Sequence, residues 1–314
     1  MPVLPTAFSP AAISRLALAN VVANGAIIVT GGVVRLTGSG LGCPTWPRCT
    51  AESFVTTPEL AGHGVIEFGN RLLTFVLTAV AVALLVAVLR SPRRDLRPLA
   101  VLAFLGIPAQ AAIGGVTVLI GLNPWTVAIH FLVSVVLTAV ATVLWLRSRE
   151  PGVGRPLVRR PIALLVGGIA AVTAAVLVLG TIVTDSGPHS GDVDGNDVPT
   201  GDRMGFDIEL VSQLHADVVF LLVGLTIALL VALYATDAPG RVRRAARDLL
   251  VVQLLQGVIG FVQYFTHLPV VLVLLHMLGA VLVTVFTARL VWSVRGPASE
   301  APLGSSQVPA SATR

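Results

Sequence analysis

The sequence contains few charged and few aromatic residues. Of its 314 residues, 12% are charged and 5% are aromatic, while 55% are hydrophobic and the mean hydropathy is +0.88. About a quarter of the residues in a typical soluble domain are charged. The composition therefore excludes an ordinary soluble domain and indicates a protein of the lipid bilayer.

The sequence also lacks the marks of two other classes. It has no succession of alternating stretches of about ten residues, which membrane β-barrels show. No glycine-rich dinucleotide-binding fingerprint lies between a strand and a helix. Apolar runs of roughly 20 residues, the length that a helix needs to cross a bilayer, recur instead. We predict an all-α integral membrane protein with eight transmembrane helices, at about 14–36, 64–89, 98–121, 126–147, 160–184, 209–235, 248–267 and 269–293.

Lysine is absent, so arginine supplies all 21 basic residues. The arginines gather in the loops after the second, fourth and sixth predicted helices. Because such loops face the cytoplasm by the positive-inside rule, we expect a multi-pass plasma-membrane protein with both termini in the cytoplasm. The formal charge of +5 is divided among these short loops, so we expect no nucleic-acid partner.

Only two cysteines are present, Cys43 and Cys49, both in the first outer loop. The outer side of a bacterial-type membrane permits disulfides, which favours a bond between them. Two free thiols are the alternative. A metal site is not expected, because no further ligands lie nearby.

An internal repeat divides the chain. At an offset near 146 residues, the motif TGSG matches TDSG, and QAAIGGV from Gln110 matches QGVIGFV from Gln256. His130 and His276 each follow these glutamines by twenty residues. We therefore predict two tandem, pseudo-symmetric four-helix bundles that enter the membrane from the same side. The expected segments are an N-terminal bundle, a C-terminal bundle and a disordered cytoplasmic tail, at 1–150, 151–295 and 296–314.

Histidines inside the spans indicate function, because ionisable residues are costly there. His130 and His276 occupy equivalent positions, and His215 lies at a similar depth, about two helical turns below the outer surface. Two imidazoles from facing helices of a bundle can take both axial positions of a haem iron. We predict His215 and His276 as such a pair. Histidines satisfied by neighbouring carbonyl groups are the alternative.

The first half differs at the position equivalent to His215, which is Asn70. His63, Glu67 and Asn70 fall within about 60° of arc on one helix face. A carboxylate at this depth, opposite His130, is costly unless it is paired or used. Glu67 is therefore either a proton-handling group beside a bound ligand or part of a structural ion pair.

Two arginines lie near the outer ends of their helices, Arg35 and Arg71. Either could form the ion pair with Glu67. Both could instead bind the propionates of a haem through charge-assisted hydrogen bonds, or extend to the membrane interface.

These residues resemble a known family. The stretches GGVVRLTGSGLGCPTWPRC, IEFGNR, GLNPWTVAIHF, QLHAD and LLHMLGA occur in this order between about residues 20 and 292, and they resemble the haem A synthase family. The resemblance covers nearly the whole chain. It implies an eight-helix oxidoreductase that oxidises the C8 methyl group of haem O to the formyl group of haem A, for terminal oxidases.

The resemblance implies a substrate haem in the first bundle and a haem b cofactor in the second. His215 and His276 match the ligands of the haem b iron, and His130 matches a ligand of the substrate haem iron. Glu67 matches the acidic residue of the second helix, which implies a catalytic role. The two cysteines match the outer-loop pair of the family.

Asn70 departs from the family pattern, because many relatives have histidine there. The substrate iron is then held by His130 alone, by His63, or by Asn70 through a water. Arg35 and Arg71 complete the expected substrate haem site.

The resemblance also implies haem O as substrate, contact with membrane lipid, a membrane electron acceptor and a partnership with haem O synthase. A homo-oligomer is a further possibility that the sequence leaves open.

Two other functions compete with the hypothesis of a haem A synthase. A di-haem b-type electron-transfer protein explains the histidine pair but gives Glu67 no role. A transporter predicts matching breaks in both halves, whereas the break at 106–108 has no counterpart near residue 252.

Overall fold

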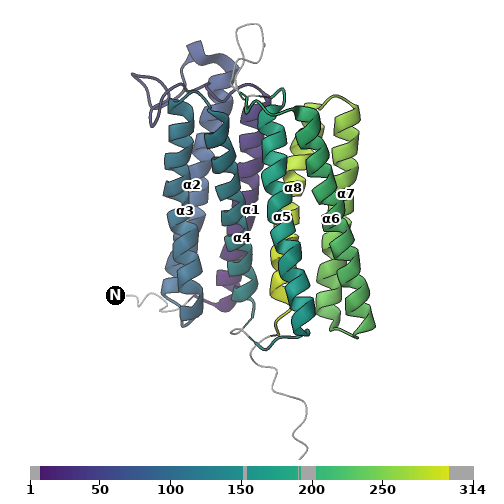
Figure 1. Cartoon of the computed structure of the whole chain (residues 1–314). Coiled ribbons are helices and arrows are strands. Elements are labelled where there is room, and N and C mark those ends of the chain that lie inside the picture. Colours follow the sequence, from purple (N-terminus) through teal and green to yellow (C-terminus); the bar gives the residue numbers. More distant parts are fainter. Residues whose placement is uncertain (1–7, 151–153, 190, 192–202, 297–314) are drawn as a thin grey trace, which may run out of the picture.

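The computed structural model describes residues 8–150, 154–189, 191 and 203–296. Eight long helices run side by side in this part of the chain (Figure 1). They are α1 (Pro10–Leu36), α2 (Ala61–Leu89), α3 (Arg97–Leu119), α4 (Pro124–Ser148), α5 (Arg160–Ser186), α6 (Ile208–Ala235), α7 (Gly240–Phe265) and α8 (Val270–Ser293). Each is long and apolar enough to span a bilayer, which confirms the predicted fold class. The predicted tail, except Gly296, lies outside the described residues.

The helix ends agree with the prediction to within a few residues, with one exception. Helix α7 begins at Gly240 rather than near residue 248. Its first two turns contain four arginines, which end an apolar run but are good helix formers. Hydropathy therefore marks where a span leaves the hydrocarbon, and the helix continues beyond that point.

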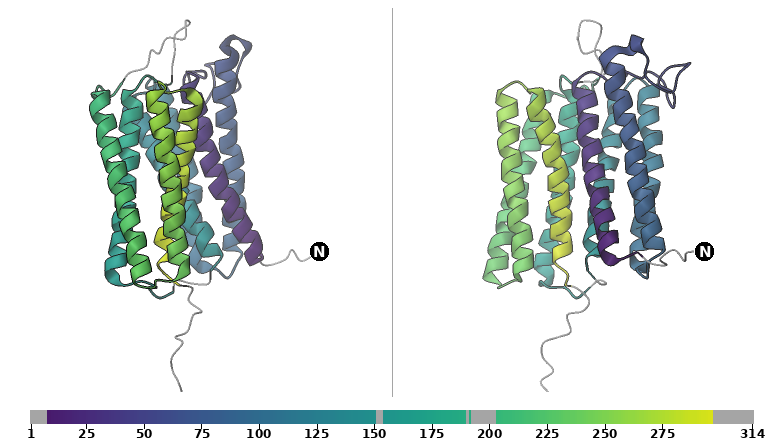
Figure 2. Two further views of the ribbon diagram at one scale, coloured as in Figure 1. Left: turned by 90° about the vertical axis from the view of Figure 1, so that its right-hand side faces the viewer. Right: turned by 180° about the vertical axis from the view of Figure 1, so that it is seen from behind.

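Contacts between helices form two rings of four. In the first half α1 contacts α2 and α4, and α3 contacts α2 and α4. In the second half α5 contacts α6 and α8, and α7 contacts α6 and α8. The halves meet through α4 with α8, α1 with α8, and α4 with α5, so that both stand side by side in all views (Figures 1 and 2).

Glycines allow close approach where the halves meet. A Cβ atom at Gly32 on α1 would lie 2.5 Å from the sulfur of Met277 on α8, and one at Gly25 would lie 3.1 Å from Val281. Small residues commonly occupy such helix interfaces in membranes, because they let backbones come together.

Polar contacts join the halves at both ends. At the upper end in Figure 1, which carries the long loops, Arg35 forms an ion pair with Asp185. At the lower end, Glu150 accepts hydrogen bonds from Arg241 and from the indole nitrogen of Trp292, at 3.1 Å each. These contacts hold the two bundles in one orientation.

Candidate functional site

The second half carries one half-buried imidazole on α6 and another on α8. His215 lies two turns below the start of α6, and His276 lies at a similar depth on α8. The two rings are close enough to interact electrostatically. His130 occupies the equivalent depth on α4 of the first half.

A glycine on a neighbouring helix lies against each of these rings. A Cβ atom at Gly114 on α3 would lie 3.2 Å from Cε1 of His130, and one at Gly260 on α7 would lie 3.3 Å from Cε1 of His276. Gly180 on α5 faces His215 in the same way, at 3.1 Å. Any other residue would push the ring, because these distances are shorter than ordinary contacts.

A glutamine fixes the backbone beside two of the histidines. The side-chain amide of Gln110 donates to the carbonyl of His130 at 2.9 Å, and that of Gln256 donates to the carbonyl of His276 at 2.7 Å. The sequence repeat contains both glutamines and two of the three glycines. The repeat therefore preserves a local arrangement of glutamine, glycine and histidine across two helices.

The three imidazoles fit the axial positions of a haem iron. The Nδ1 atoms of His130, His215 and His276 are buried, and those of His130 and His276 have no hydrogen-bond partner among the described residues. Imidazole nitrogen is a common axial ligand of haem iron.

Glu67 on α2 is buried, with 5% of its surface exposed. Its Oε1 accepts from Nε of Arg71 at 3.1 Å, and its Oε2 accepts from the backbone N–H of Cys43 at 2.5 Å. The ion pair considered from the sequence is therefore present with Arg71, and not with Arg35. It ties the carboxylate to the first outer loop.

Arg71 and a disulfide organise that loop. Cys43 and Cys49 form a disulfide, the favoured prediction. The guanidinium of Arg71 donates to the carbonyl groups of Cys43, Thr45 and Arg48, in addition to Glu67. All five of its N–H groups are thus used by protein acceptors. As a partner of haem propionates, Arg71 stays a prediction.

His63 and Asn70 lie on α2 with different partners. Nδ1 of His63 is 2.9 Å from the hydroxyl of Ser39. The amide oxygen of Asn70 accepts from the hydroxyl of Thr30 on α1 at 2.7 Å.

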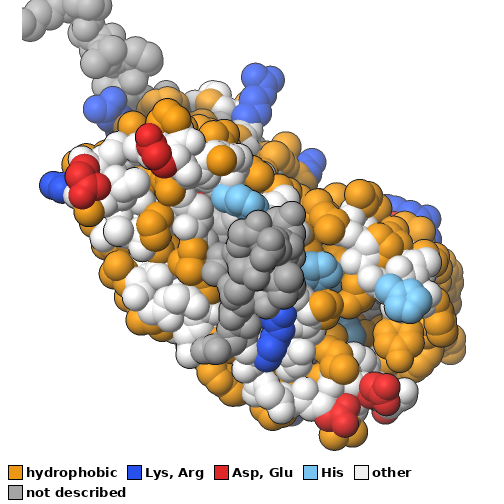
Figure 3. All heavy atoms as spheres, turned by 90° about the horizontal axis from the view of Figure 1, so that it is seen from above, with side chains coloured by type: hydrophobic (Ala, Val, Ile, Leu, Met, Phe, Trp, Pro, Cys, Tyr) orange, Lys and Arg blue, Asp and Glu red, His pale blue; other side chains and the backbone are white. Residues whose placement is uncertain are grey.

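Several histidine side chains are visible on the upper face of the molecule, and acidic side chains lie near its edges (Figure 3).

Arg35 belongs to the first half, but its side chain binds residues of the second half. Besides Asp185, it donates to the carbonyl of His189 at 2.9 Å and to that of Thr184 at 3.1 Å. Burial, and then the positive charges of Arg35 and Arg203, lower the pKa of His189. A role of Arg35 in binding propionates also stays a prediction.

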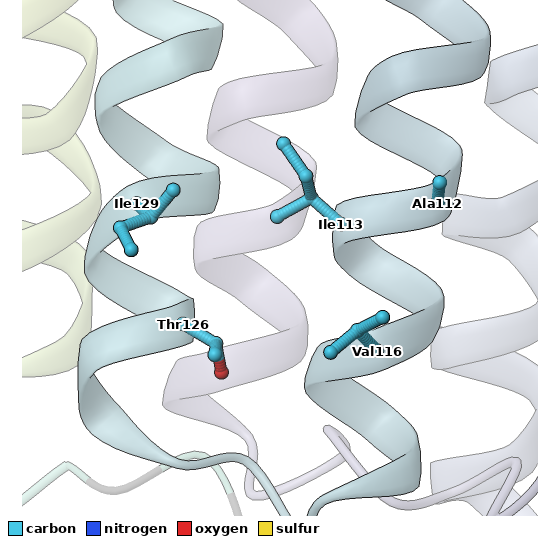
Figure 4. Close-up of a pocket in the computed structure, with 5 residues that line it drawn as sticks. All are labelled: Ala112, Ile113, Val116, Thr126 and Ile129. Carbon is cyan, nitrogen blue, oxygen red and sulfur yellow. The ribbon is translucent and has the colours of Figure 1, made fainter.

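An apolar groove of about 310 Å³ lies between α3 and α4. It is lined by Ala112, Ile113 and Val116 of α3 and by Thr126 and Ile129 of α4 (Figure 4). Ile129 and Val116 of this lining are about half exposed, so the groove lies on the outer surface of the bundle. Its lining exposes no polar surface.

Sequence reasoning missed three features of this region. Thr30 and Asp185 are polar residues within spans, and burial cost alone could have marked them as paired. The glycines facing the imidazoles were visible in the repeat, but their role depends on how neighbouring helices face each other. Side-chain pairing across helices is not readable from one sequence.

Comparisons with known proteins agree with this arrangement. Residues 14–288 match the model of a family described as "cytochrome oxidase assembly protein". A protein named heme A synthase from Listeria welshimeri is 31% identical over 127 residues, which are 40% of this chain and 41% of the relative.

Two more relatives carry the same name. The protein from Bacillus pumilus is 33% identical over 114 residues, 35% of this chain and 36% of the relative. That from Halalkalibacterium halodurans is 31% identical over 133 residues, 41% of this chain and 44% of the relative. The matched region thus spans less than half the length of these curated relatives.

Proposed function

Because the chain belongs to the family of cytochrome oxidase assembly proteins, we propose that it is a haem A synthase. It would oxidise the C8 methyl group of haem O to the formyl group of haem A. The observation that carries this proposal is the buried imidazole of His130, set in the same glutamine and glycine surroundings as His276. One such site suits a resident haem, and the other a haem substrate.

The second half would hold haem b through His215 and His276. Support comes from the buried Nδ1 atom of each ring and from the glycines that face the two rings. Two imidazoles, one from α6 and one from α8, would hold this haem as a resident group. When bound, this haem would supply one-electron chemistry.

The first half would hold haem O through His130. Glu67 would accept protons released as the methyl group is oxidised, while the electrons pass to the proposed membrane acceptor. Its burial and its two hydrogen-bonding partners fix it in one position, which general acid–base chemistry requires.

We also propose the orientation of the protein and its partners. Arginines at the lower end in Figure 1, for example Arg93, Arg147 and Arg241, support a cytoplasmic position of that end by the positive-inside rule. The protein would then be a multi-pass plasma-membrane protein with cytoplasmic termini. A membrane electron acceptor, haem O synthase and a second copy of the chain are the proposed partners.

The test is the conversion itself. Membranes from cells that make haem O and express the chain should accumulate haem A, measured by chromatography and mass spectrometry of extracted haems. Glu67→Gln should lower this rate about a hundredfold or more while haem b stays bound. Glu59→Gln, at an exposed position in the short 3-10 helix Pro58–Leu60, is the matched control.

Two outcomes would overturn parts of the proposal. A pigmented protein that retains haem b but leaves haem O unchanged would favour an electron-transfer protein. Glu67→Gln at the normal rate would remove the carboxylate from the chemistry.

A further inference from the structure

The halves differ at one position of α2 and α6 that the sequence repeat makes equivalent. In the second half this position is His215, and in the first half it is Asn70. The helix that precedes it, α1 in the first half and α5 in the second, differs at a matching position. Alignment of TGSG on TDSG pairs Val33 with Gly180, the glycine that faces His215 at 3.1 Å. The first half thus lacks both the second imidazole and the glycine that makes room for it.

Asn70 is also held differently. Thr30, whose equivalent in the second half is Leu177, donates its hydroxyl to the amide oxygen of Asn70 at 2.7 Å. The amide oxygen already accepts from Thr30, and the NH₂ group donates hydrogen bonds and has no lone pair for a metal.

His63 does not replace the missing ligand. It precedes Asn70 by seven residues, so its backbone lies about 10 Å nearer the loop end of α2. Its Nδ1 atom pairs with Ser39 in the outer loop.

We propose that the first half is a one-histidine site: His130 is the single protein ligand of its haem iron, and Thr30 positions Asn70 as a hydrogen-bond donor beside the opposite, unligated face. This inference rests on the proposed function. It explains how one duplicated bundle distinguishes a resident haem from a substrate. Two protein ligands retain a haem, whereas one ligand allows it to enter and leave.

The experiment measures spin state rather than product. Protein is purified from cells that lack haem O, haem O is added, and the difference absorbance and paramagnetic resonance spectra report the added haem alone. The wild-type protein should give a high-spin signal for haem O next to the low-spin signal of haem b. Added cyanide should bind to the haem O without displacing haem b.

Three variants test the individual residues. The double variant Asn70→His with Val33→Gly reproduces the second half, and should convert the haem O signal to low spin and slow cyanide binding. Asn70→Leu should leave haem O high-spin but weaken cyanide binding about tenfold, because a donor to the bound anion is lost. Thr30→Val should weaken it by a smaller factor, since the amide is then free to turn.

The outcomes separate the two proposals. Low-spin haem O in the wild-type protein would overturn the one-histidine site while leaving the synthase function intact. Unchanged cyanide affinity in both Asn70→Leu and Thr30→Val would overturn the positioning role of these residues. Failure to take up any haem O would overturn the proposed function, and this inference with it.

Discussion

The two halves share a scaffold and differ in what they place on it. Both set a glutamine on the carbonyl of a histidine and a glycine against its ring. Only the second half adds another imidazole, His215, and only the first half has a buried carboxylate on the corresponding helix face. The position equivalent to Glu67 is Ser212 in the second half.

The loops at the upper end extend this difference. In the first half Trp46, from the disulfide loop, lies so close to α3 that a Cβ atom at Gly115 would be 2.4 Å from its ring. The equivalent of Gly115 in the second half is Phe261, an aromatic residue on the helix itself. Phe261 is about half exposed, whereas Trp46 in the first half belongs to a loop tied to Glu67 through Arg71. Both halves thus share the arrangement of glutamine, glycine and histidine, and the first half adds polar contacts between its outer loop and α2.

The largest effect is expected from a variant that changes only the second half. His276→Ala removes one of the two imidazoles proposed to hold haem b, so the low-spin haem signal should disappear from absorbance and paramagnetic resonance spectra. His267→Ala, at an exposed position in the loop before α8, is the control and should leave the spectrum unchanged. A normal low-spin signal in His276→Ala would contradict the ligand assignment.

An intermediate effect is expected from the glycine that faces His276. In Gly260→Ala, the added methyl group would lie 3.3 Å from Cε1 of the ring, so the imidazole must shift by a few tenths of an ångström. The paramagnetic resonance g-values of haem b should change, and part of the haem should be lost during purification. Gly257→Ala on the same helix meets nothing within 4 Å and serves as the control. Identical spectra for both variants would show that the glycine is not needed to place the ring.

The sequence predicted the scaffold better than the site. Eight spans and the duplication follow from hydropathy and repeated motifs, because a bilayer demands long apolar helices and symmetry preserves spacing. The depth of His130 and His276 followed from the same repeat. Partners across helices did not follow, since they depend on rotation about each axis. Thus the sequence left Glu67 between Arg35 and Arg71, and the structure pairs it with Arg71.

The smallest expected effect distinguishes the halves by crossed variants. Gln256→Leu removes one hydrogen bond to the carbonyl of His276, at a cost of about 0.5–1 kcal/mol in a membrane bundle. Gln110→Leu removes the equivalent bond to His130 and a second one to Ser134, so it should cost more. Gln256→Leu should shift the midpoint potential of haem b and leave the affinity for haem O unchanged. Gln110→Leu should weaken the affinity for haem O and leave the midpoint potential of haem b unchanged. Redox titration and haem O binding, measured on both proteins, check this pattern. Equal effects of both variants on both haems would mean that the halves do not act as separate sites, because each glutamine contacts a single histidine.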